Sequence, residues 1–357
     1  MGIILAILVF GLIVTIHELG HFLLAKKNGI HVEEFSIGMG PRLFSKVAGD
    51  TRYSIKLLPI GGSCMMGEDD VEDMSEGSFN TKPVWARISV IAAGPIFNFI
   101  LAFIFAVILV AWVGYDKPVI SGVTPGYSAE AEGMQAGDQI LKMNGKKINV
   151  WREVLYFNVF HPGETVDLTY ERDGEKHEVT ITPQKDENGA YKLGLMSPGK
   201  NEEANLFTAL QYGAYEVKLW ICTTLESLKM LVTGQVGVDQ LSGPVGIVDM
   251  VGNTYEQSKS YGLSVVIIEL MNIAILLSAN LGVMNLIPFP ALDGGRLVFL
   301  FIEAIRGKRV PPDKEGMVHF AGLMLLFALM IFVMFNDIRD YFNNWGRSKI
   351  QFYYVPN

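Results

Sequence analysis

The sequence is poor in cysteine and has no block of basic residues. It contains 2 cysteines among 357 residues, Cys64 and Cys222, which lie far apart and belong to no CxxC pair. Neither a disulfide framework nor a sulfur-ligated metal site is therefore expected. The formal net charge is −8 and no Lys/Arg-rich segment or internal repeat is visible. This charge pattern argues against a nucleic-acid-binding surface.

The first apolar run lacks the features of a cleaved signal peptide. No basic segment precedes it and no small-residue cleavage signal follows it. It extends from Ile3 to Ala25, which is longer than the apolar region of a signal peptide. A membrane helix that is retained in the mature protein is the better interpretation.

Apolar residues, by contrast, are abundant. They make up 50% of the sequence, and the mean hydropathy is +0.30. These values predict membrane spans combined with a soluble insert. Four runs have the roughly 20 apolar residues that a membrane-spanning helix needs. They are Ile3–Ala25, Ile88–Trp112, about Leu270–Leu292, and Val318–Phe335.

The basic residues between these runs predict the orientation of the chain. An even number of spans puts both termini on one side of the membrane, and no Lys or Arg precedes the first span. Between the first and second runs lie Lys26, Lys27, Arg42, Lys46, Arg52, Lys56, Lys82 and Arg87, and between the third and fourth lie Arg296, Arg306, Lys308, Arg309 and Lys314. The positive-inside rule then places both basic loops in the cytoplasm and both termini outside. The middle segment, residues 113–262, is expected to be extracytoplasmic.

The middle segment contains two kinds of pattern. Residues 116–200 show short alternating strands separated by turns, and "TVDLTYERDGEKHEVTI" predicts a hairpin with its turn at Asp173-Gly174. Residues 203–232 change to helical spacing without a run that is long enough to span. We expect a small β-rich domain followed by an amphipathic helix that leans on the membrane surface or on the other helices.

The loop after the first run also has the alternation of strands. The segments "VEEFSI", "RLFSKV" and "TRYSIKLL" are separated by "GMGP", "AGD" and "PIGG". This pattern predicts a small sheet or hairpin near the cytoplasmic half of the bilayer. Because unpaired strand edges are not tolerated in lipid, the sheet must pack on helices or line a water-filled cavity.

The first run contains a candidate metal site, "HELGH". His17 and His21 are four residues apart and share a helix face, and Glu18 is placed to act as a base on water. HExxH also occurs by chance in soluble helices, and a hydrogen-bonded structural cluster is the alternative. Two histidines and a glutamate inside a membrane span are costly unless they serve a purpose, which favours the metal site.

Asp293 is the candidate third ligand. It follows the third apolar run in "NLIPFPALDGG", at the same cytoplasmic depth as the two histidines of the first run. The alternative is that Asp293 only opens a turn with Gly294 and Gly295. His319 begins the fourth run and is expected at the interface. The other histidines, His31, His161 and His177, lie outside every span.

These motifs together resemble the site-2 protease family of intramembrane zinc metalloproteases. "HELGH" in a first span is paired with N-x-x-P-x-x-x-L-D-G at residues 285–294. Supporting segments are "GMGPRLF", "PIGGSCMMGE", "AAGPIFNFILA" and "SGPVGIV". The resemblance covers the chain nearly end to end. It is strongest to the bacterial branch that cleaves anti-sigma factors, in its shorter form with a single PDZ domain.

The resemblance implies roles for individual residues. His17, His21 and Asp293 would be the zinc ligands, and Glu18 the general base. Asn285 would hydrogen-bond the substrate backbone near the scissile bond. Pro59, Gly61 and Gly62 would form a turn in the loop that receives the substrate as an added strand. The alternative for these three residues is an ordinary turn. For "AAGPIFN", close helix packing is expected, and a chemical role is the alternative.

The resemblance also implies a fold and a function. We expect a polytopic α-helical membrane protein with four transmembrane helices, a membrane-associated β-hairpin loop and an inserted extracytoplasmic PDZ-like domain. Its expected parts are residues 1–114, the PDZ-like domain 115–200, an amphipathic helix and connector 201–262, and the last two spans with the tail 263–357. In the bacterial inner membrane it would use Zn²⁺ to cut single-pass membrane proteins, such as anti-sigma factors pre-trimmed by another protease, or signal-peptide remnants.

Two other functions fit parts of the sequence. A non-catalytic receptor would bind peptides through the PDZ-like domain and use the His-Glu-His cluster only structurally. A metal transporter would need further intramembrane carboxylates or histidines along a path, and none is visible beyond one site. For the PDZ-like domain itself, both a size filter and a docking site for a cut end remain open.

Overall fold

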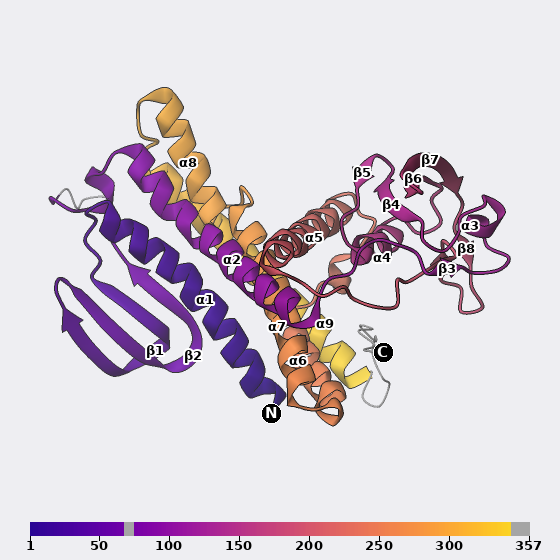
Figure 1. The fold of residues 1–357 in the computed structure, drawn as a ribbon. Coiled ribbons are helices and arrows are strands. Elements are labelled where there is room, and N and C mark those ends of the chain that lie inside the picture. Colours follow the sequence, from indigo (N-terminus) through magenta and orange to yellow (C-terminus); the bar gives the residue numbers. More distant parts are fainter. Residues whose placement is uncertain (68–74, 344–357) are drawn as a thin grey trace. The chain divides into compact units, whose positions relative to one another are not determined.

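The computed structural model describes residues 1–67 and 75–343, which form two compact units (Figure 1). One unit contains Met1–Ala102 and the described residues from Thr233 onward, and the other contains Phe103–Val232. The division falls inside helix α2, Val84–Val113. The four-part division expected from the sequence stays a prediction.

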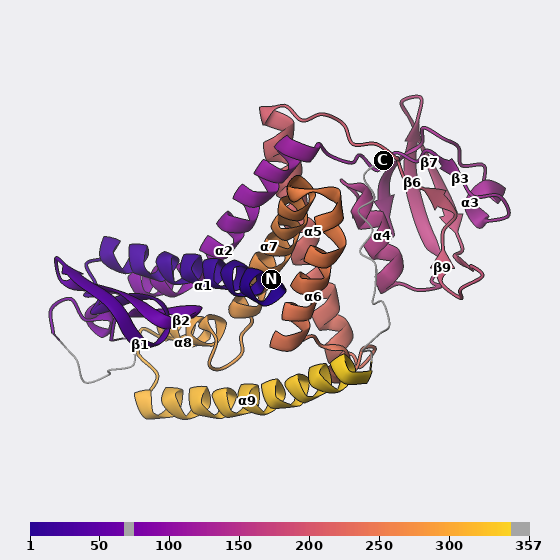
Figure 2. The same cartoon turned by 90° about the horizontal axis from the view of Figure 1, so that it is seen from below.

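Four described helices are long and apolar enough to cross a membrane, as expected. They are α1 (Gly2–Lys27), α2, α7 (Leu263–Leu286) and, within α9 (Pro312–Asn343), the stretch Asp313–Arg339. The first unit also contains two helices that the sequence analysis did not predict, α6 (Pro244–Ser258) and α8 (Asp293–Arg306). Short 3-10 turns cover Phe79–Thr81, Val238–Gln240 and Lys259–Tyr261. Figure 2 shows α9, in yellow, with its C-terminal part beside α6.

Helices α1 and α2 approach each other closely at two glycines. A Cβ added to Gly20 would lie 2.4 Å from the carbonyl oxygen of Ala93, and one added to Gly94 would lie 2.3 Å from His21 Nε2. Small residues allow this approach, which is the usual way in which membrane helices gain van der Waals contact. The histidine face of α1 is therefore held directly against α2.

The third span ends earlier than expected. The apolar run predicted a span that continues to about Leu292, whereas α7 ends at Leu286 and α8 begins at Asp293. Pro288 and Pro290 explain this, because a proline cannot donate a helix hydrogen bond and the residue before it avoids the helical conformation. Asp293 consequently begins a separate helix instead of ending the span.

The predicted sheet after α1 is confirmed. Strands β1 (Glu34–Ala48) and β2 (Thr51–Met65) are antiparallel and bent. Residues 34–37 pair on one side with 52–55 and on the other with 62–65. In the described part of the chain, residues 62–65 have a strand partner on one side only. They form an edge strand, and the sheet packs on α1.

The second unit contains the predicted β-rich domain. Its largest sheet has the order β5-β4-β6-β7, and β6 (Val166–Arg172) pairs with β7 (Glu175–Ile181). Asp173 and Gly174 both have positive φ, as a type I′ hairpin turn requires. The remaining elements are β3 (Gly122–Val123), α3 (Ser128–Ala131), β4 (Gln139–Met143), β5 (Lys146–Lys147), α4 (Trp151–Phe160), β8 (Gln184–Lys185), β9 (Tyr191–Lys192) and β10 (Leu195–Met196).

The core of this domain is made by the inward-facing residues of β4 and β6. Ile140, Met143, Val166 and Leu168 are fully or almost fully buried there, with Trp151 of α4 against them. The predicted amphipathic helix follows as α5, Leu206–Val232. An ion pair between Arg152 of α4 and Glu216 of α5 joins the helix to the domain.

Candidate metal centre

His17 and His21 face the interior of the first unit from successive turns of α1. Both side chains are buried, and their Nε2 atoms lie 3.2 Å apart. This follows from helix geometry, since residues four apart share a face. Gly94 of α2 makes room for them, because a Cβ there would lie 2.7 Å from His17 Cε1.

Asp293 completes a triangle with the two histidines. Its Oδ2 lies 3.1 Å from His17 Nε2 and 3.5 Å from His21 Nε2. Gly294 and Gly295 allow this position, because both pack against the link between α7 and α8. A Cβ on Gly294 would lie 2.1 Å from a backbone oxygen of that link, and a Cβ on Gly295 would lie 2.4 Å from one. Asp293 thus begins a helix packed on that link, and the alternative of a simple Asp-Gly turn is wrong.

The triangle matches the ligand set of one tetrahedral zinc ion. With metal–ligand bonds of about 2.0 to 2.1 Å, two ligand atoms of a tetrahedron are about 3.3 Å apart. The three measured separations, 3.1, 3.2 and 3.5 Å, are close to that value. Two imidazole nitrogens with one carboxylate are also a donor set that zinc accepts, and they leave a fourth position open. The residues therefore fit the metal.

The outer nitrogen of each imidazole also has a partner. His21 Nδ1 lies 2.9 Å from the carbonyl oxygen of Val90, and His17 Nδ1 lies 3.1 Å from Asn98 Nδ2. Histidines that bind metals usually have such outer partners, which orient the ring. The sequence pattern predicted only helix packing for "AAGPIFN", so these contacts were not expected. An amide inside an apolar span was the available signal.

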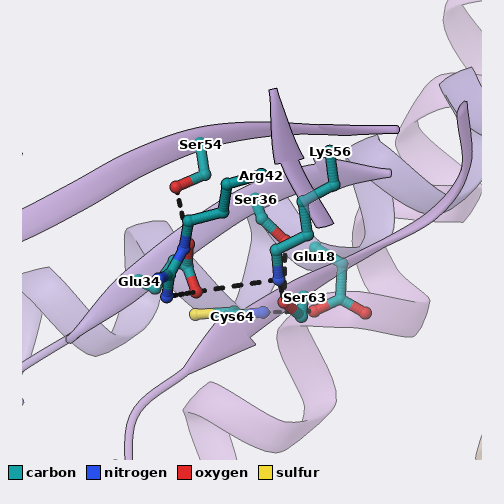
Figure 3. Close-up of polar contacts among 8 residues, drawn as sticks. All are labelled: Glu18, Glu34, Ser36, Arg42, Ser54, Lys56, Ser63 and Cys64. Atoms are coloured by element: carbon teal, nitrogen blue, oxygen red, sulfur yellow. Dashed lines mark hydrogen bonds and ion pairs between the residues drawn. The ribbon is translucent and has the colours of Figure 1, made fainter. Parts of the chain in front are cut away.

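Glu18 lies next to the metal triangle and reaches the edge strand of the sheet. Its Oε2 accepts a hydrogen bond from the backbone N–H of Cys64, at 3.0 Å. Its Cγ lies 3.3 Å from where a Cβ on Gly62 would stand. Figure 3 shows Glu18 beside Ser63 and Cys64 of β2. The candidate base and the edge strand are therefore in direct contact.

A second charged group, Glu34, lies in the same sheet (Figure 3). The buried Glu34 carboxylate accepts hydrogen bonds from Arg42 Nε at 2.7 Å and from Ser54 Oγ at 2.5 Å. The Lys56 ammonium lies 3.6 Å away and also approaches Ser63. The hydrogen bond from Arg42 is the main reason why the pKa of Glu34 falls from 4.5 to about 2. The carboxylate is thus kept charged inside the sheet.

The residues that were predicted to contact the substrate lie on β2 and at the end of α7. The carbonyl oxygen of Pro59 lies 2.7 Å from a Cβ built on Gly11, so this part of β2 touches α1. Gly61 has a φ of 84°, which favours glycine. Asn285 lies in the last turn of α7 and is partly exposed. The substrate-binding roles of Pro59, Gly61, Gly62 and Asn285 stay predictions.

His319 contacts the link between α7 and α8. The N–H of Ala291, a residue with a φ of 77°, donates to His319 Nδ1 at 3.0 Å. A Cβ on Gly322 would lie 2.4 Å from Pro290 Cβ, so α9 covers the same link. Helix α9 therefore helps to fix the backbone that precedes Asp293.

Comparison with known proteins agrees with this geometry. The profile of Peptidase family M50 matches residues 5–329. The zinc metalloprotease RasP of Geobacillus kaustophilus is 34% identical, over 96% of this chain and 98% of its own. The regulator of sigma-W protease RasP of Bacillus subtilis is 35% identical, over 94% of this chain and 98% of its own.

A solved structure is similar to part of the chain. It is the PDZ domain of the SdrC-like protein from Listeria monocytogenes, which is 23% identical and covers 24% of this chain and 92% of its own. The TM-score is 0.21. The PDZ-like character of the domain is what the family resemblance implies.

Proposed function

The chain belongs to peptidase family M50, whose members include zinc metalloproteases that align with it nearly end to end, and we propose that it is an intramembrane endopeptidase. Its substrates would be the transmembrane segments of single-pass membrane proteins. The observation that carries this proposal is the triangle of His17 Nε2, His21 Nε2 and Asp293 Oδ2. It is built from helices that flank or form membrane spans.

We assign His17, His21 and Asp293 as the zinc ligands and Glu18 as the general base. When bound, the zinc would polarise the scissile carbonyl and activate water. The Glu18 carboxylate would take the proton from that water and return it to the leaving amine. The contact of Glu18 with the edge strand supports this role, because it keeps the base beside the strand where a peptide would lie.

The edge strand is the proposed substrate-binding strand. A transmembrane helix must unwind before its peptide bond can be cut, and its freed N–H and C=O groups then need partners. An added strand along residues 62–65 would supply them, as in other cases of strand addition. Pro59, Gly61 and Gly62 would form the adjoining turn, and Asn285 would hold the backbone near the cleaved bond.

The proposed orientation puts the active site near the cytoplasmic side of a bacterial inner membrane. The excess of Lys and Arg in the two loops supports it. Both termini and the PDZ-like domain would be extracytoplasmic. One relative is the regulator of sigma-W protease RasP of Bacillus subtilis. An anti-sigma factor that another protease has already trimmed is therefore the first substrate to test, followed by signal-peptide remnants.

Cleavage by the purified, zinc-loaded full chain tests the proposal. The wild type and Glu18→Gln are compared on a tagged single-pass segment in detergent micelles, and the products are mapped by mass spectrometry. We expect the wild type to cut within the apolar segment, and Glu18→Gln to hold equal zinc but not to cut. Cleavage by the variant would remove Glu18 as the base. Binding without cleavage by the wild type would instead favour a receptor.

A further inference from the structure

Asn98 of α2 contacts a predicted metal ligand, and the family resemblance assigns it no role. We propose that Asn98 is a positioning residue that accepts a hydrogen bond from His17 Nδ1–H and so keeps His17 Nε2 available for the metal. The proposal rests on the metal site proposed above. It assigns a chemical role to a segment that the sequence analysis attributed to packing.

Because Asn98 is buried, its amide must find its hydrogen-bond partners within the protein. The residue is 0% exposed, and its Nδ2 lies 3.1 Å from His17 Nδ1. Among the described residues its Oδ1 has no hydrogen-bond partner and is itself buried. A buried polar atom without a partner is costly. Rotation of the amide by half a turn exchanges the two atoms and turns the unpaired oxygen toward His17.

The two orientations of the amide correspond to two tautomers of His17. With Nδ2 facing the ring, Nδ1 accepts a hydrogen bond and the proton is on Nε2, the atom that faces Asp293. With Oδ1 facing the ring, the proton is on Nδ1 and the lone pair of Nε2 is free to bind a metal. An amide side chain can form a hydrogen bond with either tautomer. A carbonyl oxygen can pair only with the tautomer that carries its proton on Nδ1.

His21 provides the comparison within the same site. Its Nδ1 faces the carbonyl oxygen of Val90, at 2.9 Å. A carbonyl can only accept, so the proton of His21 is on Nδ1 and its Nε2 faces the triangle as a ligand. Asn98 is the side chain that can give His17 the same arrangement.

Neighbouring contacts hold Asn98 in place. Ser278 Oγ of α7 donates to the backbone carbonyl of Asn98, at 2.8 Å and fully buried. The ring of Phe99 fills the space over Gly282, where a Cβ would lie 2.7 Å from it. The backbone of α2 is therefore fixed against α7, and the Asn98 amide can rotate only in place.

Two substitutions of similar size separate hydrogen bonding from packing. Asn98→Leu removes both polar atoms, and Asn98→Asp keeps the accepting oxygen but removes the donor. The measurement is zinc affinity, by competition of the purified full chain with a chromophoric chelator. We expect Asn98→Leu to lower the affinity about 10- to 100-fold, as for other outer partners of metal ligands. Asn98→Asp should retain zinc at the wild-type level or better.

Controls keep the outcomes distinct. Ser258→Ala in α6 removes the hydrogen bond that this buried serine donates to the carbonyl oxygen of Thr254, which does not involve Asn98, and should leave zinc affinity unchanged. The thermal unfolding of each variant in detergent identifies those that are folded. Loss of zinc from Asn98→Asp would overturn the proposal, because it would mean that the amide donor is required. Wild-type zinc affinity in Asn98→Leu would overturn it too. If the wild type itself bound no zinc, the proposed function would fail first.

Discussion

Glu18 accepts a hydrogen bond from the backbone N–H of Cys64, at 3.0 Å. Glu18 follows a candidate metal ligand on α1, and Cys64 lies on the edge strand of the sheet. The N–H that would pair with an added peptide strand is therefore occupied by the candidate base. A bound substrate would compete with Glu18 for it, and pairing would release the carboxylate toward water.

Removal of the Cys64 N–H should weaken substrate binding at the edge. Cys64→Pro deletes this donor, and proline is tolerated on an edge strand where its nitrogen faces away from the neighbouring strand. We expect cleavage to fall roughly tenfold, the effect of one lost hydrogen bond, with zinc content unchanged. Cys64→Ala, which keeps the N–H, is the matched control. Equal rates for both variants would show that the edge strand does not receive the substrate at this position.

Asp293→Ala should lose zinc. The substitution removes one of three proposed ligands. Zinc affinity should therefore fall more than 100-fold, which is about the largest effect of removing an outer partner of a metal ligand. Metal analysis after dialysis against a chelator measures it. Glu18→Gln is the control, because it lies as close to the site but should retain zinc. Wild-type zinc content in Asp293→Ala would exclude Asp293 from the ligand set.

Glu34 should make the stability of the sheet depend on acidic pH. Its pKa is about 2 in the fold, against an ordinary 4.5. The charged carboxylate therefore stabilises the fold above pH 4.5, and this stabilisation disappears as the pH falls toward 2. The difference corresponds to about 3 kcal/mol.

Thermal unfolding in detergent at pH 7 and pH 3 checks this. Glu34→Gln should be clearly less stable than the wild type at pH 7, and this difference in stability should be smaller at pH 3. Glu33→Gln, an exposed neighbour, is the control and should have little effect at either pH. A gap of equal size at both pH values would contradict the assignment.

Asp337 should contribute stability without affecting the metal. Its carboxylate accepts hydrogen bonds from the N–H groups of Gly243, at 3.2 Å, and Gly246, at 2.8 Å, where α6 begins. Asp337→Ala should lower the free energy of unfolding by about 1 to 2 kcal/mol, as the loss of a helix cap does. Zinc content should stay the same. Asp337→Asn keeps one accepting oxygen and should have an intermediate effect, and a wild-type melting curve for Asp337→Ala would refute the cap.

The sequence predicted the elements whose patterns are strong. The four apolar runs, the hairpin around Asp173-Gly174 and the strands after α1 are all present. His17, His21 and Asp293 were predicted to meet and do. This succeeded because burying ionisable groups in an apolar run is costly, so few residues could serve as partners.

The errors have physical causes too. The end of the third span was placed late because apolar residues continue past Leu286, although Pro288 and Pro290 end the helix. Helix α6 was missed because its composition is mixed, and its start depends on Asp337, far along the chain. The contact of Asn98 with His17 depends on how α2 packs on α1, which no local pattern records.

The metal triangle draws its members from opposite ends of the sequence. Two come from the first helix and the third comes from α8, after the third span. During synthesis the two histidines are made long before Asp293. A growing chain therefore holds only two of the three proposed ligands, and the proposed capacity to cut peptide bonds would arise only after the β-rich domain and the third span have been made. The order of the sequence thus delays hydrolytic activity until most of the chain has been synthesised.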